Sequence, residues 1–155
     1  MSTRSTRIAI NLIAVLALFQ VIRLAAFTIV QDALAGNVAE AWVFPAVTDV
    51  VVGAAAPFIA YGVWRGRGLG VWTAAIVFFS LSISDHLDAI AVVITSHGPR
   101  PSLMSGPEGA VVAQLVVMST FELLAVIALT RPSLRRHFLS PAMPQQATLD
   151  SADLT

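Results

Sequence analysis

Residues 69–95 read LGVWTAAIVFFSLSISDHLDAIAVVIT, an apolar run that contains two aspartates. A helix of about 20 mostly apolar residues crosses the ~30 Å hydrocarbon core of a membrane, so this run is long enough to span one. An ionised group in hydrocarbon costs at least ~2.5–3.5 kcal/mol, and chains keep such groups mainly where they pair or have a function. The apolar run therefore indicates a membrane helix, and Asp85 and Asp88 within it indicate a functional site.

Three further apolar runs lie outside this one, at residues 8–30, 43–64 and 110–130, and short polar or Gly/Pro-rich segments separate them. Lipid offers no hydrogen bonds to the backbone and none of the runs alternates with period two, so helices are expected rather than barrel strands. The predicted fold class is an all-α integral membrane four-helix bundle. It forms one domain over residues 1–136, followed by a disordered cytoplasmic tail over residues 137–155.

The composition supports a membrane protein. Hydrophobic residues make up 57% of the 155-residue chain, charged residues only 12%, and the mean hydropathy is +0.81. Such a chain has too few polar groups to cover a globular surface, so the lipid bilayer is an expected partner. The formal net charge of zero gives no support for nucleic-acid binding. The absence of cysteine excludes disulfides and thiolate metal sites.

The arginines predict the orientation. Seven of them fall on one side of the four-span arrangement, and only Arg100 falls on the other. The positive-inside rule then places both termini in the cytoplasm. Because all the basic residues are arginine and Ala and Val are abundant, the coding bias indicates a GC-rich bacterial genome. The expected location is therefore the bacterial inner (cell) membrane. The seven arginines are Arg4, Arg7, Arg65, Arg67, Arg131, Arg135 and Arg136.

The N-terminal run has features of a signal peptide as well as of a membrane helix. Arg4 and Arg7, the apolar stretch after them and the sequence Ala33-Leu34-Ala35 also resemble a signal peptide. Residues 20–35 are too long and too apolar for the segment before a cleavage site, so a retained first helix is expected.

Trp42, at the outer end of the second run, is expected in the aromatic belt that faces the membrane interface.

Charged residues inside the runs lie at similar depths. At a rise of about 1.5 Å per residue, Arg23, Asp49, Asp85, Asp88 and Glu122 all fall in the outer half of the span or near its middle. Residues three apart share a helix face. Gln20 and Ser82, each three residues before one of these charges, extend the polar faces. We therefore expect one buried cluster that is open to the outer side.

The charges of this cluster do not balance. Asp49, Asp85, Asp88 and Glu122 offer four negative charges, whereas Arg23 supplies one positive charge and the imidazole of His86 at most one more. Either some carboxyl groups hold protons or a cation is bound. The leading hypothesis is a membrane protein that binds a cation or a small cationic or proton-coupled solute. Its candidate ligand- or cation-binding residues are Arg23, Asp49, Asp85, His86, Asp88 and Glu122.

A metal would use carboxylate oxygens here. Asp85 and Asp88 share a helix face, and together with Asp49 they are the candidate metal ligands. His86 points about 100° away from Asp85, which favours a packed, hydrogen-bonded histidine over a zinc ligand. His86 and His97 lie near the same end of one region, and two histidines of one helix cannot sandwich a haem, so a haem within a monomer is not expected, whereas a bound cation stays open.

Two alternatives remain open, and the sequence does not decide whether the protein is an enzyme. In the first, Asp49 works with Asp85 or Asp88 as an acid/base pair on a lipid-derived or peptide substrate. In the second, Arg23 and the acids form a buried network in a structural or accessory subunit. Four helices are few for alternating access, so a transporter of this size is expected to be a homo-oligomer.

In size, helix number and acidic residues near the outer side, the chain resembles lipoprotein signal peptidases. The Asn- and Asp-bearing motifs of that family are missing. Asn11 and Asn37 are the only asparagines, and neither precedes a candidate aspartate at a suitable distance. The resemblance is therefore one of architecture, and no catalytic role is carried over to any residue.

Overall fold

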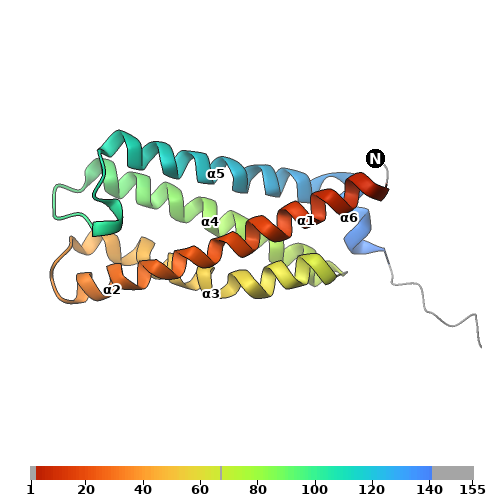
Figure 1. Ribbon diagram of the computed structural model, residues 1–155, viewed down its shortest axis with the longest axis horizontal. Coiled ribbons are helices and arrows are strands. Elements are labelled where there is room, and N and C mark those ends of the chain that lie inside the picture. Colours follow the sequence, from red (N-terminus) through yellow and green to blue (C-terminus); the bar gives the residue numbers. More distant parts are fainter. Residues whose placement is uncertain (1–2, 67, 141–155) are drawn as a thin grey trace, which may run out of the picture.

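The computed structural model describes residues 3–66 and 68–140, which form helices and no strand. Four long helical segments run side by side, and the N-terminus and α6 lie at the same end (Figure 1). All four are long and apolar enough to cross a membrane, which confirms the prediction of four helices of this length and composition. They cover Arg4–Leu34, Glu40–Arg65, Leu69–Thr95 and Glu108–Thr130.

The elements follow the predicted runs closely. The first segment contains α1 (Thr3–Phe19), η1 (Gln20–Ala26) and α2 (Phe27–Leu34), and it is followed by α3 (Val43–Arg65), α4 (Leu69–Thr95) and α5 (Glu108–Thr130). Two single turns, η2 (Glu40–Trp42) and η3 (Ser102–Met104), lie in the connections, and α6 (Pro132–Leu139) ends the described part. Below, the arginine-rich end is where α1 and α4 begin, and the arginine-poor end is the opposite one.

The first span is not the uniform helix that the sequence predicts. Its middle, η1, is a 3-10 helix of 7 residues, longer than the three or four residues usual for this conformation. With 3.0 residues per turn, residues three apart lie in line, and Gln20, Arg23 and Ala26 are all buried. A Cβ at Gly53 of α3 would lie 2.8 Å from the Leu24 backbone nitrogen. Glycine therefore lets α3 pack directly against the backbone of η1.

The interior consists of three layers. The first apolar layer, toward the arginine-rich end, contains Ala17, Phe79 and Leu129 among others. The second apolar layer, toward the arginine-poor end, includes Ile29 and Val93. Between them every span contributes buried or half-buried polar side chains, which we call the polar layer. It is formed by Gln20, Arg23, Asp49, Ser82, Asp85, His86 and Glu122.

Helix α6 extends the folded part beyond the predicted domain boundary at residue 136. Leu134 and Phe138 are buried against the first apolar layer. The Gly68 N–H donates a hydrogen bond to the Phe138 carbonyl oxygen at 2.6 Å, which ties α6 to the start of α4. Residues 141–155 of the predicted tail lie outside the described residues.

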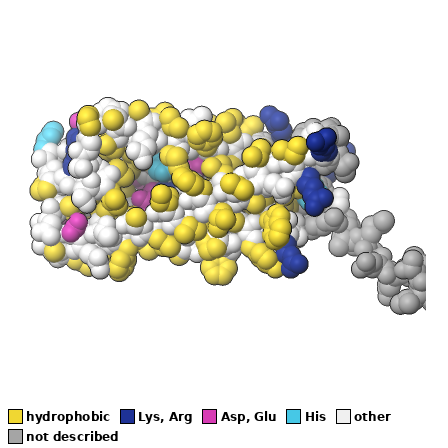
Figure 2. Space-filling model, viewed as in Figure 1, with side chains coloured by type: hydrophobic (Ala, Val, Ile, Leu, Met, Phe, Trp, Pro, Cys, Tyr) yellow, Lys and Arg dark blue, Asp and Glu magenta, His cyan; other side chains and the backbone are white. Residues whose placement is uncertain are grey.

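The surface agrees with a lipid-facing bundle. Hydrophobic side chains cover the length of the visible face, and arginines gather at the end that holds the N-terminus (Figure 2). Trp64 is 63% exposed near the arginine-rich end. The expected lipid-facing position of Trp42 is wrong, because this side chain is only 1% exposed and packs in the second apolar layer.

Candidate functional site

Arg23 is the centre of the polar layer. Its guanidinium donates from Nε to Asp49 of α3 and from Nη2 to Asp85 of α4, and Nη1 donates to the hydroxyl of Ser82. All three guanidinium nitrogens are thus engaged, and the residue is only 8% exposed. Contacts to two carboxylates from one planar group are strong and directional. Arg23 therefore fixes the positions of η1, α3 and α4 relative to one another.

Glu122 of α5 is a second centre, and it is fully buried. Its Oε1 accepts hydrogen bonds from Ser82 Oγ at 2.6 Å and from Gln20 Nε2 at 3.0 Å. Its Oε2 lies 3.0 Å from Nδ1 of His86. Buried polar groups are expected to be satisfied in this way. The carboxyl group thereby joins α5 to both η1 and α4.

Two uncharged side chains connect the centres. Ser82 accepts from Arg23 and donates to Glu122. Gln20 accepts from Arg23 Nη1 at 3.4 Å and donates to the same Glu122 oxygen. The ion pair between Arg23 Nη1 and Glu122 Oε1 spans 3.6 Å. A single hydrogen-bonded network therefore runs from Asp49 to His86 and includes all four spans.

Helix geometry explains how these side chains meet. Ser82, Asp85 and His86 lie three and four residues apart, so they share the inward face of α4. Gln20 and Arg23 are aligned by the 3-10 conformation of η1. On α3, Asp49 lies four residues before Gly53, where α3 packs against the backbone of η1. The close packing of α3 on η1 thus brings Asp49 within reach of Arg23.

The structure brings together five of the six candidate residues, namely Arg23, Asp49, Asp85, His86 and Glu122. The sixth, Asp88, is half-buried and forms no hydrogen bond or ion pair with any side chain that the structure describes. It lies one turn nearer the arginine-poor end. Gln20 and Ser82 were placed on the polar faces by their spacing, but the sequence reasoning did not include them in the site.

The charges within the layer remain unbalanced. With Asp49, Asp85 and Glu122 ionised and His86 neutral, three negative charges and one positive charge leave a net charge of −2. Asp49 is the most accessible of the three acids, with a side chain that is 19% exposed. Asp85 Oδ1 is buried and has no hydrogen-bond partner in the described part of the chain. Net charge at this depth is costly unless a further positive charge or a proton is present.

The arrangement does not favour a metal ion. Among residues 3–66 and 68–140, no three His, Asp or Glu side chains are grouped so that they could hold one. The Arg23 guanidinium contacts both Asp49 and Asp85, where a bound cation would be expected. The candidate metal set also includes Asp88, which lies outside the network.

No member of the polar layer lines any of the five best-formed pockets in the described part of the chain. The polar layer is therefore a filled site in which side chains contact one another. Between Asp49 and Asp85 lies the Arg23 guanidinium, which contacts both carboxylates. The acid/base hypothesis stays a prediction: Asp49 and Asp85 meet at the same guanidinium, but none of these five pockets reaches them.

No protein-family model matches this chain, and neither a curated protein nor a solved structure shows significant similarity to it.

Proposed function

We propose that this chain is a multi-pass protein of a cell membrane, with both termini in the cytoplasm, whose polar layer is a proton-binding site. The observation that carries the proposal is the composition of the network. Three carboxyl groups share one guanidinium and one imidazole in a buried layer. This narrows the predicted cation site to the proton, the one cation that the filled layer accommodates without displacing a side chain.

The charge balance gives the number of protons. Ionised Asp49, Asp85 and Glu122 with Arg23 give −3 + 1 = −2, so two protons make the layer neutral. One proton belongs to the pair of Glu122 and His86, which lie 3.0 Å apart. The other belongs to Asp49 and Asp85, which both contact Arg23. Ionisable residues inside a membrane span are typically part of ion or proton pathways.

Access is expected from the arginine-poor end, which is the outer side in this orientation. Asp49 is the most exposed carboxyl of the layer, and it lies in the second turn of α3. Asp88 is half-buried between the layer and the same end. A proton would reach Asp49 first and then pass along the hydrogen bonds of the layer. A 3-10 stretch within a helix is a common hinge, so η1 is the element expected to move.

Infrared spectroscopy of the purified protein tests the proposal directly. An ester-free maltoside detergent leaves the carbonyl region of protonated carboxylic acids clear. We expect a band from the carboxyl group that shares a proton between Asp49 and Asp85 near pH 7, and this band should be altered in Asp85→Asn. Asp88→Asn is the matched control and should leave the band unchanged. Absence of any such band between roughly pH 5 and pH 8 would contradict the proposal.

A structural or accessory role is the second candidate, favoured by one observation. Every guanidinium nitrogen of Arg23 is engaged within the protein, and buried networks can be retained without catalysis or transport. The proton-binding and the structural role differ in whether the carboxyl protons exchange with solvent deuterium. A proton-binding site will shift its carboxyl bands in D2O within minutes and will respond to pH, whereas a purely structural layer will do neither until the bundle unfolds.

A further inference from the structure

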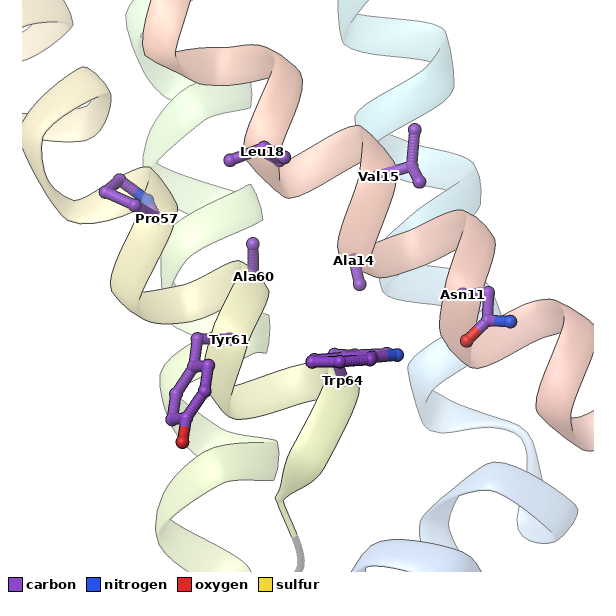
Figure 3. Close-up of a pocket in the computed structure, with 8 residues that line it drawn as sticks. All are labelled: Asn11, Ala14, Val15, Leu18, Pro57, Ala60, Tyr61 and Trp64. Carbon is purple, nitrogen blue, oxygen red and sulfur yellow. The ribbon is translucent and has the colours of Figure 1, made fainter.

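Two neighbouring pockets lie at the arginine-rich end and share two lining residues. The first lies between α1 and α3, has a volume of about 470 Å³ and is mostly apolar. The second has a volume of about 640 Å³ and lies where α1, α3 and α6 converge. Both are lined by Asn11 and Trp64. Figure 3 shows Leu18, Ala60 and Trp64 extending into the space between the two helices, with the Trp64 ring directed toward Asn11.

One face of α1 runs through both pockets. Arg4, Arg7, Asn11, Ala14 and Leu18 are spaced by three and four residues, so they form a single stripe. The stripe changes from basic through polar to apolar as it enters the span. An amphiphile with an anionic head and a hydrocarbon tail has the same order of properties.

The charges at this end favour an anionic head. Arg4 and Arg7 are both exposed and line the second pocket together with Ser133 and His137 of α6. No acidic side chain lines either pocket. Among residues 3–66 and 68–140, every Asp and Glu lies in the polar layer or closer to the arginine-poor end. Basic pockets beside membrane helices on the cytoplasmic side bind the head groups of acidic lipids.

We infer that these two pockets form one binding site for an anionic phospholipid of the surrounding bilayer. The phosphate lies between Arg4, Arg7 and the α6 side chains, and one acyl chain lies along Ala14, Leu18 and Ala60. The exposed indole of Trp64 separates the two parts at the level of the interface, where tryptophan is enriched. The inference rests on the proposed membrane location but is independent of the proton site.

The test is native mass spectrometry of the full chain in detergent, with equimolar phosphatidylglycerol and phosphatidylcholine. We expect phosphatidylglycerol to be retained preferentially. The Arg4→Gln/Arg7→Gln variant should bind it roughly 30-fold more weakly, the change expected for two basic contacts with an anionic lipid. Arg131→Gln/Arg136→Gln removes the same charge outside both pockets and should change the affinity less than threefold.

A second pair of variants tests the tail groove. Trp64→Ala should weaken phosphatidylglycerol binding several-fold, whereas Phe58→Ala, which removes an exposed aromatic from the same helix outside both pockets, should have no effect. Both side chains are exposed on the surface of the bundle, so the fold should persist in both variants. A circular-dichroism melt without added lipid checks this.

Three results would overturn the inference. They are equal retention of the two lipids, equal loss of binding in the two arginine pairs, and competition by free glycerol phosphate as effective as that by phosphatidylglycerol. The last result would indicate a site for a soluble phosphate. Failure of the membrane proposal would be recognised separately, because the protein would then be released from membranes by alkaline carbonate without detergent.

Discussion

The polar layer and the first apolar layer are built from the same four spans, but they are stabilised in different ways. In the apolar layer, Phe79 is fully buried and packs edge-to-face on Phe78 with ring centroids 5.2 Å apart. Neighbouring apolar side chains can adjust in part to a substitution in such a core. In the polar layer each charged group depends on a particular partner, because removing that partner leaves an uncompensated charge in the interior. The polar layer therefore specifies how the helices are rotated, whereas the apolar layer mainly holds them together.

The largest expected effect comes from removing the centre of the polar layer. Arg23→Ala leaves Asp49 and Asp85 without their cation, and it should lower the free energy of unfolding by about 3–5 kcal/mol. Phe79→Ala should cost a similar amount through a cavity. Unfolding by increasing SDS in mixed micelles, followed by circular dichroism, measures both.

Rescue separates the two mechanisms. The triple variant Arg23→Met/Asp49→Leu/Asp85→Leu removes the charges together and should recover most of the stability lost in Arg23→Ala. The same three changes should not recover the stability that Phe79→Ala loses. A loss below about 1 kcal/mol in Arg23→Ala, or no recovery in the triple variant, would show that the polar layer does not depend on charge pairing.

A smaller difference is expected between two aspartates one turn apart. Asp85→Asn weakens a charged hydrogen bond to Arg23, so it should destabilise the protein by about 2–3 kcal/mol. Asp88→Asn removes no contact within the described residues and should stay within about 0.5 kcal/mol. The same unfolding assay applies. Equal effects at the two positions would mean that Asp88 also belongs to the buried network.

The smallest effect tests how α3 approaches η1. In Gly53→Ala the new methyl group would lie 2.8 Å from the Leu24 backbone nitrogen, so η1 must shift at a cost of about 1–2 kcal/mol. Hydrogen–deuterium exchange of residues 20–26 should accelerate. Gly109→Ala, where a Cβ meets nothing within 4 Å, is the matched control. Unchanged exchange in Gly53→Ala would contradict the role given to this glycine.

Several features were predictable because they depend on local composition. The length of each apolar run predicted four helical spans, and the charges inside these runs predicted a buried acidic cluster with Arg23. Other features were not predictable. They are the 3-10 conformation of η1, the burial of Trp42 in the second apolar layer and the packing of Phe138 of α6 against the first apolar layer.

By itself the sequence determined which side chains cannot face lipid, because an ionised group in an apolar run needs a partner. It did not determine the partners. Asp85 and Asp88 are only 60° apart around their helix, and rotation of α4 against η1 decided that Asp85 contacts Arg23 while Asp88 does not. Likewise, only the tertiary structure placed Gln20 and Ser82 between Arg23 and Glu122. The physical reason is that the need of a charged side chain to avoid lipid follows from the apolar segment around it, whereas its hydrogen-bond partners depend on the relative positions of four helices.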